Sequence, residues 1–599
     1  MLQRTTLRTL IPLLAFAPLA NAGTKFADAN LTTGANDGSS WADAFRGVDA
    51  LQSALAASVA GDQIWVADGL YKPTATTTRS ITFTLKNGVE IYGGFAGGET
   101  LLSQRNLALN VATLSGDLAG NDGANIFTDN SFHVLVGTGA NATAVIDGFT
   151  VRGGNANGAG ANEDRGGGIL CLSGTPVIRN CLFTANRCTF GGGAGYINSA
   201  SPTFLDTVFD GNFGSNFGGA FDMANGVGAT FDRCTFRNNS AARAGGIEIF
   251  GGSSVKVWNC LFHNNTSTGT GGGGAIFVSG SSPQIRNCTI LNNSATANAT
   301  GGILGAGGSV INCVVFGNTG QGGSSGQAAQ LSPSNMSVTY TLTSTGFTGT
   351  GNVTGTPLFN NCGPSPFRLA TNSPGIDAGN NAGVPAGVTK DLAGGNRFGD
   401  ALLVANTGAG SAPIVDMGAF ESSDCNGNGV PDWCDLQSGT SLDADANGVP
   451  DDCECTGGVL PSVYCTAKLN SQLCLPAIAA VGFASPTIAQ PLTISATNIL
   501  SQKQGLLFYG YAAAALPFQG GILCVNPPLK RTPAQNSGGS AGGADCTGTF
   551  TFNFNAFIVS GTDPLLIAGQ QVNAQYWSRD PQDPFTTNLT NAAQFTICN

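Results

Sequence analysis

The sequence predicts an all-β protein whose largest part is a right-handed parallel β-helix, and three observations carry that prediction. A unit of about 26 residues recurs six times between residues 178 and 318. Its Gly, Asn, Thr and β-branched residues oppose helix, and the long Leu-, Ala- and Glu-rich stretches of helical repeats are missing. A unit this short buries little core alone, so neighbouring copies must cover one another. Stacked coils of short strands account for all three observations.

The six copies carry the same residue types at the same offsets. The central column is aromatic or β-branched: Phe183, Phe209, Phe236, Phe262, Ile290 and Val315. Five residues earlier lies an apolar column: Ile178, Phe204, Phe231, Val257, Ile285 and Val310. Two residues earlier stand Cys181, Thr207, Cys234, Cys260, Cys288 and Cys313, and three residues later Asn186, Asn212, Asn239, Asn265, Asn293 and Asn318. Stacking at roughly 4.8 Å per strand would turn these columns into aromatic, thiol and asparagine ladders.

Motifs within and beside the repeats resemble a known group of proteins. The F-x-x-N pattern, as in Phe183 to Asn186, alternates with glycine segments such as Gly218-Gly219-Ala220-Phe221. This combination resembles the repeats of chlamydial polymorphic membrane proteins. The segments 40–45, 373–379 and 415–421 resemble the entry and closing coils of secreted bacterial β-helix proteins with choice-of-anchor signatures. The resemblance covers about residues 31 to 421 and implies a pectate lyase-like solenoid with a surface or secreted role and no agreed catalytic residues.

The N-terminus predicts export. Arg4 and Arg8 precede an apolar run from Leu10 to Ala20, and residues 20–22 form a small-residue cleavage site, so residues 1–22 match a secretory signal peptide. The run is too short to span a membrane comfortably, and we expect no transmembrane segment after signal cleavage. A net charge of −11 argues against nucleic acid or an anionic membrane as partner. We therefore expect a secreted or cell-surface protein.

The 17 cysteines fall into two groups. Eight lie between Cys171 and Cys362 in the solenoid, where most belong to one inward column and suit small buried positions. Adjacent coils would bring their Cα atoms within disulfide range, but we expect stacked thiols in this ladder. Nine lie between Cys425 and Cys598, where an exported protein favours disulfides. The odd total leaves at least one cysteine unpaired or intermolecular.

Two acidic loops follow the β-helix and predict calcium binding over residues 422–455. The first places oxygen ligands at Asp424, Asn426, Asn428, Val430, Asp432 and Asp435. The second begins nineteen residues later and offers Asp443, Asp445, Asn447, Val449, Asp451 and Glu454 at the same offsets. Oxygens two residues apart, a glycine for the sharp turn and a final carboxylate are the layout of a calcium loop. The alternative is an acidic, glycine-rich linker that binds no metal.

These loops resemble thrombospondin type 3 repeats and, less closely, dockerins. Pro431 and Pro450 stand at position 8 and Cys434 and Cys453 at position 11, which argues against the flanking helices of an EF-hand. The cofactor predicted for this connector is Ca²⁺. A dockerin would imply a cohesin partner, and the expected lack of helices ranks that interpretation lower.

The chain beyond the loops changes composition again. An alternating run over residues 549–554 is typical of strands, and residues 456–599 predict a disulfide-bonded β-sandwich. Tyr576 and Trp577 are candidates for stacking on sugars, although tryptophan more often lies in a core. The predicted order is a signal peptide (1–22), a β-helix (23–421), a calcium connector (422–455) and a β-sandwich (456–599).

Catalytic candidates are few. The chain has only two histidines, and its best acidic cluster combines Asp206, Asp222, Arg233 and Glu248. Asp206 aligns with Arg233 one coil later in a column that is otherwise asparagine, which a local ion pair explains more simply than catalysis. Glycoside cleavage needs carboxylates at working distance, and fold does not imply function.

These observations predict a structural or adhesion protein that binds polysaccharide or a cell-surface protein without catalysis. Long flat sides rich in Thr, Asn and Ser would bind through many weak contacts. The first alternative is a β-helical polysaccharide lyase or glycoside hydrolase. The second is a dockerin-type assembly subunit.

Overall fold

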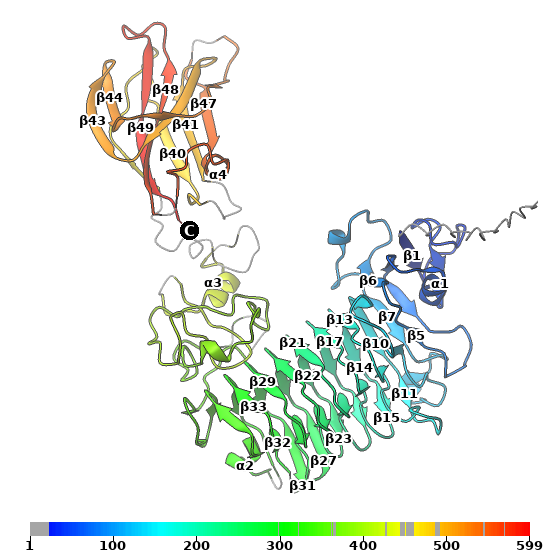
Figure 1. Cartoon of the computed structure of the whole chain (residues 1–599). Helices are drawn as coiled ribbons and strands as arrows, with labels where there is room; N and C mark the ends of the chain where they lie inside the picture. Colours follow the sequence, from blue (N-terminus) through cyan, green and yellow to red (C-terminus); the bar gives the residue numbers. More distant parts are fainter. Residues whose placement is uncertain are drawn as a thin grey trace, which may run out of the picture. The chain divides into compact units, whose positions relative to one another are not determined.

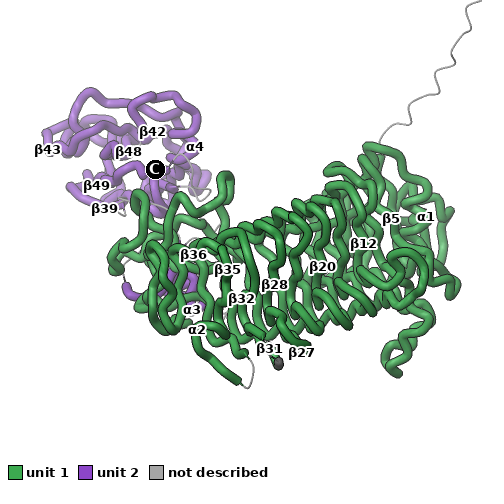
Figure 2. The backbone as a smooth tube through the Cα atoms, turned by 60° about the horizontal axis from the view of Figure 1, so that its bottom comes forward, with its two compact units in different colours: residues 1–424 green, residues 425–599 purple. Residues whose placement is uncertain are grey.

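The computed structural model describes residues 23–598, except for 298, 321–322, 361, 363–366, 426–427, 442, 444–449, 451–460, 486–491, 543–544 and 568. The chain divides into two compact units, residues 1–424 and 425–599 (Figure 2). The predicted signal peptide lies outside the described residues. Within the described part of the chain, every helix is too short or too polar to cross a membrane.

The described part of unit 1 is built from four parallel sheets to which successive coils contribute strands (Figure 1). The first sheet contains β1 (Thr24–Asp28), β2 (Phe45–Arg46), β3 (Gln63–Ala67), β6 (Glu90–Phe95), β9 (Val145–Asp147), β13 (Val177–Arg179), β17 (Thr203–Leu205), β21 (Thr230–Asp232), β25 (Lys256–Trp258), β29 (Gln284–Arg286), β33 (Ser309–Ile311) and β36 (Ser337–Thr339). The second contains β4 (Gly69–Tyr71), β7 (Ala112–Ser115), β10 (Phe149–Arg152), β14 (Leu182–Thr184), β18 (Val208–Asp210), β22 (Thr235–Arg237), β26 (Leu261–His263), β30 (Thr289–Leu291), β34 (Val314–Phe316), β37 (Leu342–Thr343) and β38 (Val353–Thr354).

The other two sheets complete each turn of the coil. The third contains β5 (Phe83–Thr84), β8 (Leu135–Val136), β12 (Ile169–Cys171), β16 (Gly195–Asn198), β20 (Phe221–Ala224), β24 (Ile247–Phe250), β28 (Ile276–Ser279), β32 (Ile303–Ala306) and β35 (Leu331–Ser334). The fourth contains β11 (Asn155–Ala156), β15 (Arg187–Cys188), β19 (Phe213–Gly214), β23 (Ser240–Ala241), β27 (Thr266–Thr270) and β31 (Ser294–Ala297). Strands that pair come from successive coils, so unit 1 is a parallel β-helix, as predicted.

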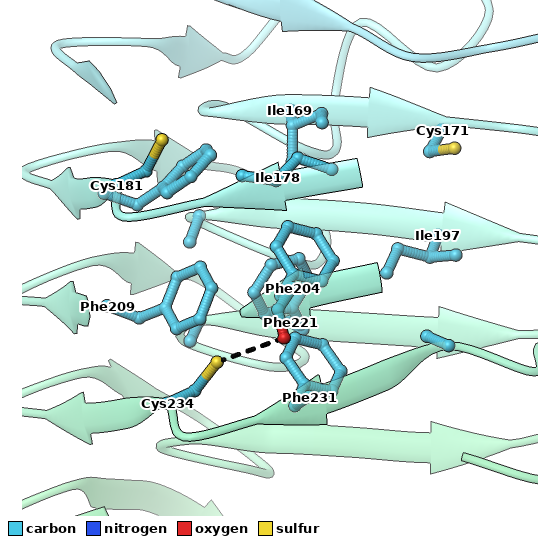
Figure 3. Close-up of a cluster of buried hydrophobic side chains, with 14 of the residues drawn as sticks. Ile169, Cys171, Ile178, Cys181, Ile197, Phe204, Phe209, Phe221, Phe231 and Cys234 are labelled. Atoms are coloured by element: carbon cyan, nitrogen blue, oxygen red, sulfur yellow. Dashed lines mark hydrogen bonds between the residues drawn. The ribbon is translucent and has the colours of Figure 1, made fainter. Parts of the chain in front are cut away.

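The register of the coils matches the sequence columns. Phe183 pairs with Phe209, Phe209 with Phe236, and Phe236 with Phe262. The rings of Phe236 and Phe262 stack with centroids 4.4 Å apart. Phe204 and Phe231 of the neighbouring apolar column stack at 4.9 Å. Figure 3 shows the two columns meeting inside the solenoid, where all these rings are fully buried. The predicted aromatic ladder is confirmed.

The asparagine column forms a continuous hydrogen-bonded ladder. Each side-chain amide donates to the side-chain oxygen of the next coil: Asn186 to Asn212 (3.1 Å), Asn212 to Asn239 (3.0 Å), Asn239 to Asn265 (2.9 Å), Asn265 to Asn293 (2.9 Å) and Asn293 to Asn318 (2.9 Å). Gln330 ends the ladder by accepting from Asn318 at 3.0 Å. A second column turns the chain between the first and second sheets in the left-handed conformation, as Asn180 (φ 52°) and Asn259 (φ 49°) illustrate. Asparagine tolerates this conformation, as expected.

Seven of the eight solenoid cysteines are thiols. Seven are free and buried: Cys171, Cys181, Cys188, Cys234, Cys260, Cys288 and Cys313. Burial raises the pKa of the Cys181 thiol to about 12, so it stays neutral. The predicted thiol ladder is confirmed. Cys362, the eighth, differs because it is disulfide-bonded.

Helices and irregular segments close the described part of unit 1. Helix α1 (Ala50–Ala57) buries Leu51 and Leu55 against the first coils, and α2 (Gln327–Gln330) precedes the last strand of the third sheet. The short 3₁₀ turns are η1 (Leu102–Gln104), η2 (Asp122–Ala124) and η4 (Asn381–Gly383).

The segment after β38 covers the outer face of the second sheet. Ile376 and Met417 pack there with Leu261 and Leu291, which are outward-facing residues of β26 and β30. The amide of Ala419 donates to Thr289 Oγ1 at 2.9 Å. The motifs expected to form closing coils therefore build a covering layer on the side of the solenoid.

Unit 2 contains antiparallel sheets and two short helices in its described part. One sheet holds β39 (Ser462–Tyr464), β42 (Gln504–Gly510), β45 (Lys530–Arg531), β46 (Gln535–Asn536), β48 (Gln571–Arg579) and β49 (Thr587–Thr596). Others hold β40 (Ala477–Val481), β41 (Thr493–Ile499) and β47 (Gly548–Asn553), and the hairpin β43 (Ala513–Phe518) and β44 (Gly521–Val525). The helices are α3 (Asp432–Ser438) and α4 (Phe554–Val559). Ile494 of one sheet and Leu507, Val572 and Phe595 of another share a core, as a β-sandwich requires.

Two disulfides and a buried tyrosine mark the sandwich. Cys465 bonds to Cys524 and Cys474 to Cys546, which confirms disulfides in this region. Cys425, Cys434 and Cys598 are also disulfide-bonded. Tyr576 is 1% exposed and donates to the carbonyl oxygen of Ile494 at 3.0 Å. Its ring is therefore core, and the suggestion that Tyr576 stacks on sugars is wrong.

Candidate functional site

Asp206 and Arg233 form an ion pair on the turn between the first and second sheets. Both residues adopt the left-handed conformation of the asparagine column, with φ of 48° and 52°. Arg233 donates from Nε and Nη2 to the two carboxylate oxygens of Asp206, at 2.7 and 2.8 Å. Arg233 also bonds to Asp232 Oδ2 at 2.8 Å. The structure thus supports the simpler reading of this pair, in which Arg233 replaces the ladder bonds of asparagine by a bidentate salt bridge.

Asp222 and Glu248 form a second acidic pair on the third sheet. They are register partners on β20 and β24, so their backbones are one strand spacing apart, and both side chains are 0% exposed. Arg243 bonds to Glu248 Oε1. Among the described residues, both oxygens of Asp222 and Oε2 of Glu248 lack a hydrogen-bond partner. Two carboxylates so placed cannot both ionise cheaply, and protonation of one of them relieves the repulsion.

Burial and mutual repulsion shift the titration of this pair. Burial, followed by the charge of Glu248, raises the pKa of Asp222 to about 8. Burial also raises the pKa of Glu248, although Arg243 opposes that shift. At neutral pH Asp222 therefore carries the proton, and Glu248, with its guanidinium partner, is the group that ionises first.

A row of planar side chains adjoins the acids through Arg243, which pairs with Glu248. Arg165 stacks on Phe190 with its guanidinium carbon 4.2 Å from the ring centroid, and Arg243 stacks on Phe217 at 4.3 Å. Phe190 and Phe217 meet edge to face at 4.9 Å. Sequence reasoning missed this row. The sequence could have indicated the row only by position, because each of its four residues comes directly before the glycine-containing segment of its coil.

The two predicted pairs do not come together into one site. Asp206 and Arg233 lie in turns that precede the second sheet, whereas Asp222 and Glu248 lie on strands of the third sheet. Gly191 adjoins the second pair so closely that a Cβ there would overlap Asp222 Oδ2. The acids of the candidate cluster are thus divided between a surface salt bridge and a sealed carboxylate pair.

The motifs at 373–379 and 415–421 form a buried polar network in the covering layer. Asp416 accepts from the amides of Asp377 and Ser422 at 2.8 Å each. Arg397 is 0% exposed and bonds to Glu421 Oε2 at 3.1 Å. Burial, with Asp416 nearby, raises the pKa of Asp377 to about 8, and burial raises the pKa of Asp416 to about 7. The closing motifs hold the layer together through paired charges.

The first acidic loop is described in part. Asp424 ends unit 1 and is 1% exposed. In unit 2, Asp432 and Asp435 are 6% and 1% exposed, and Asn428 Nδ2 donates to Asp435 Oδ2 at 2.9 Å. Val430 is described, whereas Asn426 lies outside the described residues. Buried carboxylates of this kind suit a hard cation, which would be held by Asp432 and Asp435.

The second loop lies mostly outside the described residues. Asp443 is described, whereas Asp445, Asn447, Val449, Asp451 and Glu454 are not. No cluster of three or more Cys, His, Asp or Glu side chains fit for a metal occurs among the residues that are described. The calcium sites therefore remain a prediction of the sequence.

A short helix overlaps the end of the first loop, contrary to expectation. Helix α3 begins at Asp432, directly after Pro431, whose φ is −60°. The argument from Pro431 was wrong because proline fixes the backbone angle that the start of a helix needs and lacks only an amide that would be unbonded there. Cys434 lies within the helix and is disulfide-bonded. The first loop thus has the exiting helix that the dockerin interpretation requires.

Comparisons with known proteins agree with the fold. A family model described as the right handed beta helix region matches residues 168–339, which confirms the handedness. No curated protein matches the chain. A crystal structure of pectate lyase Pel9A is similar with 17% identity and a TM-score of 0.39, covering 67% of this chain and 97% of that one. A similarity of this degree does not bear on chemistry.

Proposed function

We propose that the protein is a secreted or cell-surface structural protein whose β-helix binds glycans or surface partners without catalysis. The state of the acidic candidates carries this proposal. Asp206 is bound by Arg233, and Asp222 and Glu248 are 0% exposed. A glycosidase needs two carboxylates that reach the scissile bond from either side. Both pairs are instead parts of the solenoid structure: the first is a salt bridge on a turn, and the second is a buried carboxylate pair on the third sheet.

Several features support an extracellular role. The sequence begins with the pattern of a signal peptide, and disulfides join cysteines of unit 2. The repeats resemble those of chlamydial polymorphic membrane proteins, and the acidic loops resemble thrombospondin type 3 repeats. In this proposal the solenoid is a rigid spacer, and calcium stiffens the connector between the two units.

A polysaccharide panel tests the absence of catalysis. We expect the mature chain, with calcium present, to be retained on at least one immobilised polysaccharide and to release no reducing or unsaturated ends. The double variant Asp222→Asn, Glu248→Gln keeps the shapes of both side chains and should be retained equally. Product release by the unmodified chain that disappears in this variant would establish a lyase or hydrolase instead.

Chelation tests the connector. We expect limited proteolysis with a calcium chelator to cleave within residues 424–454 while the β-helix stays intact, because metal binding free energy couples locally to folding. Proteolysis of the same chain with excess calcium is the control. Equal resistance of the connector with and without chelator would contradict calcium binding.

A dockerin-type assembly subunit is the second candidate, and helix α3 is the observation that favours it. A dockerin pairs each calcium loop with an exiting helix, and the first loop here has one. Calcium-dependent binding to immobilised cohesin modules would select this candidate over the adhesive spacer.

A further inference from the structure

A hollow in unit 2 lies beside the turn that joins β48 to β49. It has a volume of about 470 Å³, and its lining includes Lys468, Leu469, Gly520, Asp583 and Phe585. Phe585 is 52% exposed and Leu469 is 49% exposed, so apolar surface reaches solvent at the rim. Pockets for small ligands typically have volumes of about 300–1,000 Å³ and combine apolar walls with a few fixed polar groups. The hollow has the size and composition of such a site.

Lys468 and Asp583 form the polar wall. Lys468 Nζ donates to the carbonyl oxygens of Gln519 and Thr587, at 2.8 Å each, and to Asp583 Oδ1 at 2.7 Å. Asp583 Oδ1 also accepts from the Phe585 amide at 2.8 Å. Both bonds to Asp583 fall on Oδ1, so Oδ2 is available to a donor that enters the hollow. The ammonium uses all three donors, and its charge cancels that of the carboxylate.

Phe585 forms the apolar wall. Its ring centroid is 5.2 Å from Lys468 Nζ. Gly520 has φ of +74°, and a Cβ there would lie 2.6 Å from the ring, so glycine lets the chain approach the ring closely. The ring is thus held in place from the protein side while half of its surface stays open. A fixed aromatic ring loses little conformational entropy when a ligand packs on it.

We infer that this hollow binds a neutral sugar unit, whose ring packs on Phe585 and whose hydroxyl groups donate to Asp583 Oδ2. A sugar ring has an apolar C–H face beside hydroxyl donors, which matches an exposed aromatic ring next to a charged acceptor. An acidic sugar fits less well because Asp583 Oδ2 can only accept, and Lys468 has no donor left for a sugar carboxylate. This inference rests on the proposed function, since it names where one class of glycan binds.

The test uses the mature full chain and soluble oligosaccharides. Neutral gluco-, manno-, galacto- and xylo-oligosaccharides are compared with oligogalacturonate by saturation-transfer NMR and calorimetry. We expect a neutral series to bind and Phe585→Ala to weaken that binding at least tenfold. Phe213→Ala, which removes a ring that is 40% exposed in unit 1, is the matched control and should change nothing. Because both rings are exposed, both variants should fold.

The outcomes separate the inference from the proposed function. Equal binding by the chain and by Phe585→Ala and Asp583→Asn, or binding of oligogalacturonate alone, would overturn the sugar site. If these variants were still retained on an immobilised polysaccharide, the proposed adhesive function would remain supported although the sugar site was rejected. Oligosaccharide binding that depends on Phe585, without retention on any polysaccharide, would support the site and reject adhesion by the solenoid.

Discussion

Replacement of Asn239 by alanine is expected to destabilise the β-helix by about 3 kcal/mol or more. Asn239 is 0% exposed, and its amide donates to Asn265 Oδ1 and to the carbonyl oxygen of Phe209. Its own oxygen accepts from the backbone and side-chain amides of Asn212, at 3.0 Å each. Alanine would leave several of these groups buried without partners, each at a cost of about 1–3 kcal/mol.

Denaturant unfolding of the mature chain measures this effect. Hydrogen exchange of the coils identifies the transition of unit 1, because a chain of two units need not unfold in one step. Asn216→Ala is the control, since Asn216 is exposed and its side-chain amide donates to the carbonyl oxygen of Thr189. Its loss should cost about 0.5 kcal/mol or less. If the two variants proved equally stable, the ladder would not be a main source of stability.

The ladders could be predicted because the repeat converts sequence offset into spatial contact. Once Phe209 and Phe236 are aligned as equivalent positions, the strand spacing places one above the other, and no further information is needed. The same logic applies to Asn212 and Asn239. The pairing of Asp206 with Arg233 followed for the same reason, as an exception within a column that is otherwise asparagine.

The row beside the acidic pair was not predicted. Its four residues occupy equivalent positions in successive coils, but they are not of one residue type. Along successive coils the order is Arg165, Phe190, Phe217 and Arg243, a mixture of guanidinium and phenyl groups, so no column of like residues marks them. Only their planarity is common, and it becomes visible when the coils are stacked.

The covering layer was not predicted from the sequence for a different reason. Residues 355–424 contain no repeat, and in the described part their hydrogen bonds come mostly from turns, isolated bridges and buried ion pairs such as Arg397 with Glu421. Offsets along the sequence say little about contacts of this kind. Leu291, which the layer covers, stands in the column where other coils place polar residues such as Thr184 and Asp210, and that exchange was the available signal.

The sealed acidic pair predicts that the β-helix loses stability as pH rises. The pKa of Asp222 is about 8 in the folded chain, against about 3.9 for an unfolded aspartate. Well below pH 4 Asp222 is protonated in both states, and well above pH 8 it is ionised in both. Between these limits folding must take up a proton, so the cost grows with pH and approaches about 6 kcal/mol at one pKa unit per 1.36 kcal/mol. Asp377 and Asp416 act in the same direction.

Asp222→Asn isolates the contribution of this pair. An amide at this position is neutral at every pH and can donate to Glu248 Oε2, so the variant should be more stable than the natural chain at pH 8. At pH 4 the difference should nearly vanish, because Asp222 is then neutral in the folded chain and nearly half protonated when unfolded. Thermal unfolding of unit 1 from pH 4 to pH 9 measures how stability changes with pH in the natural chain and in Asp222→Asn.

Asp206→Asn is the control, since that carboxylate is 39% exposed and its salt bridge is worth about 1 kcal/mol or less. Parallel pH profiles for the natural chain and Asp222→Asn would show that Asp222 does not take up a proton on folding, and that another group balances its charge.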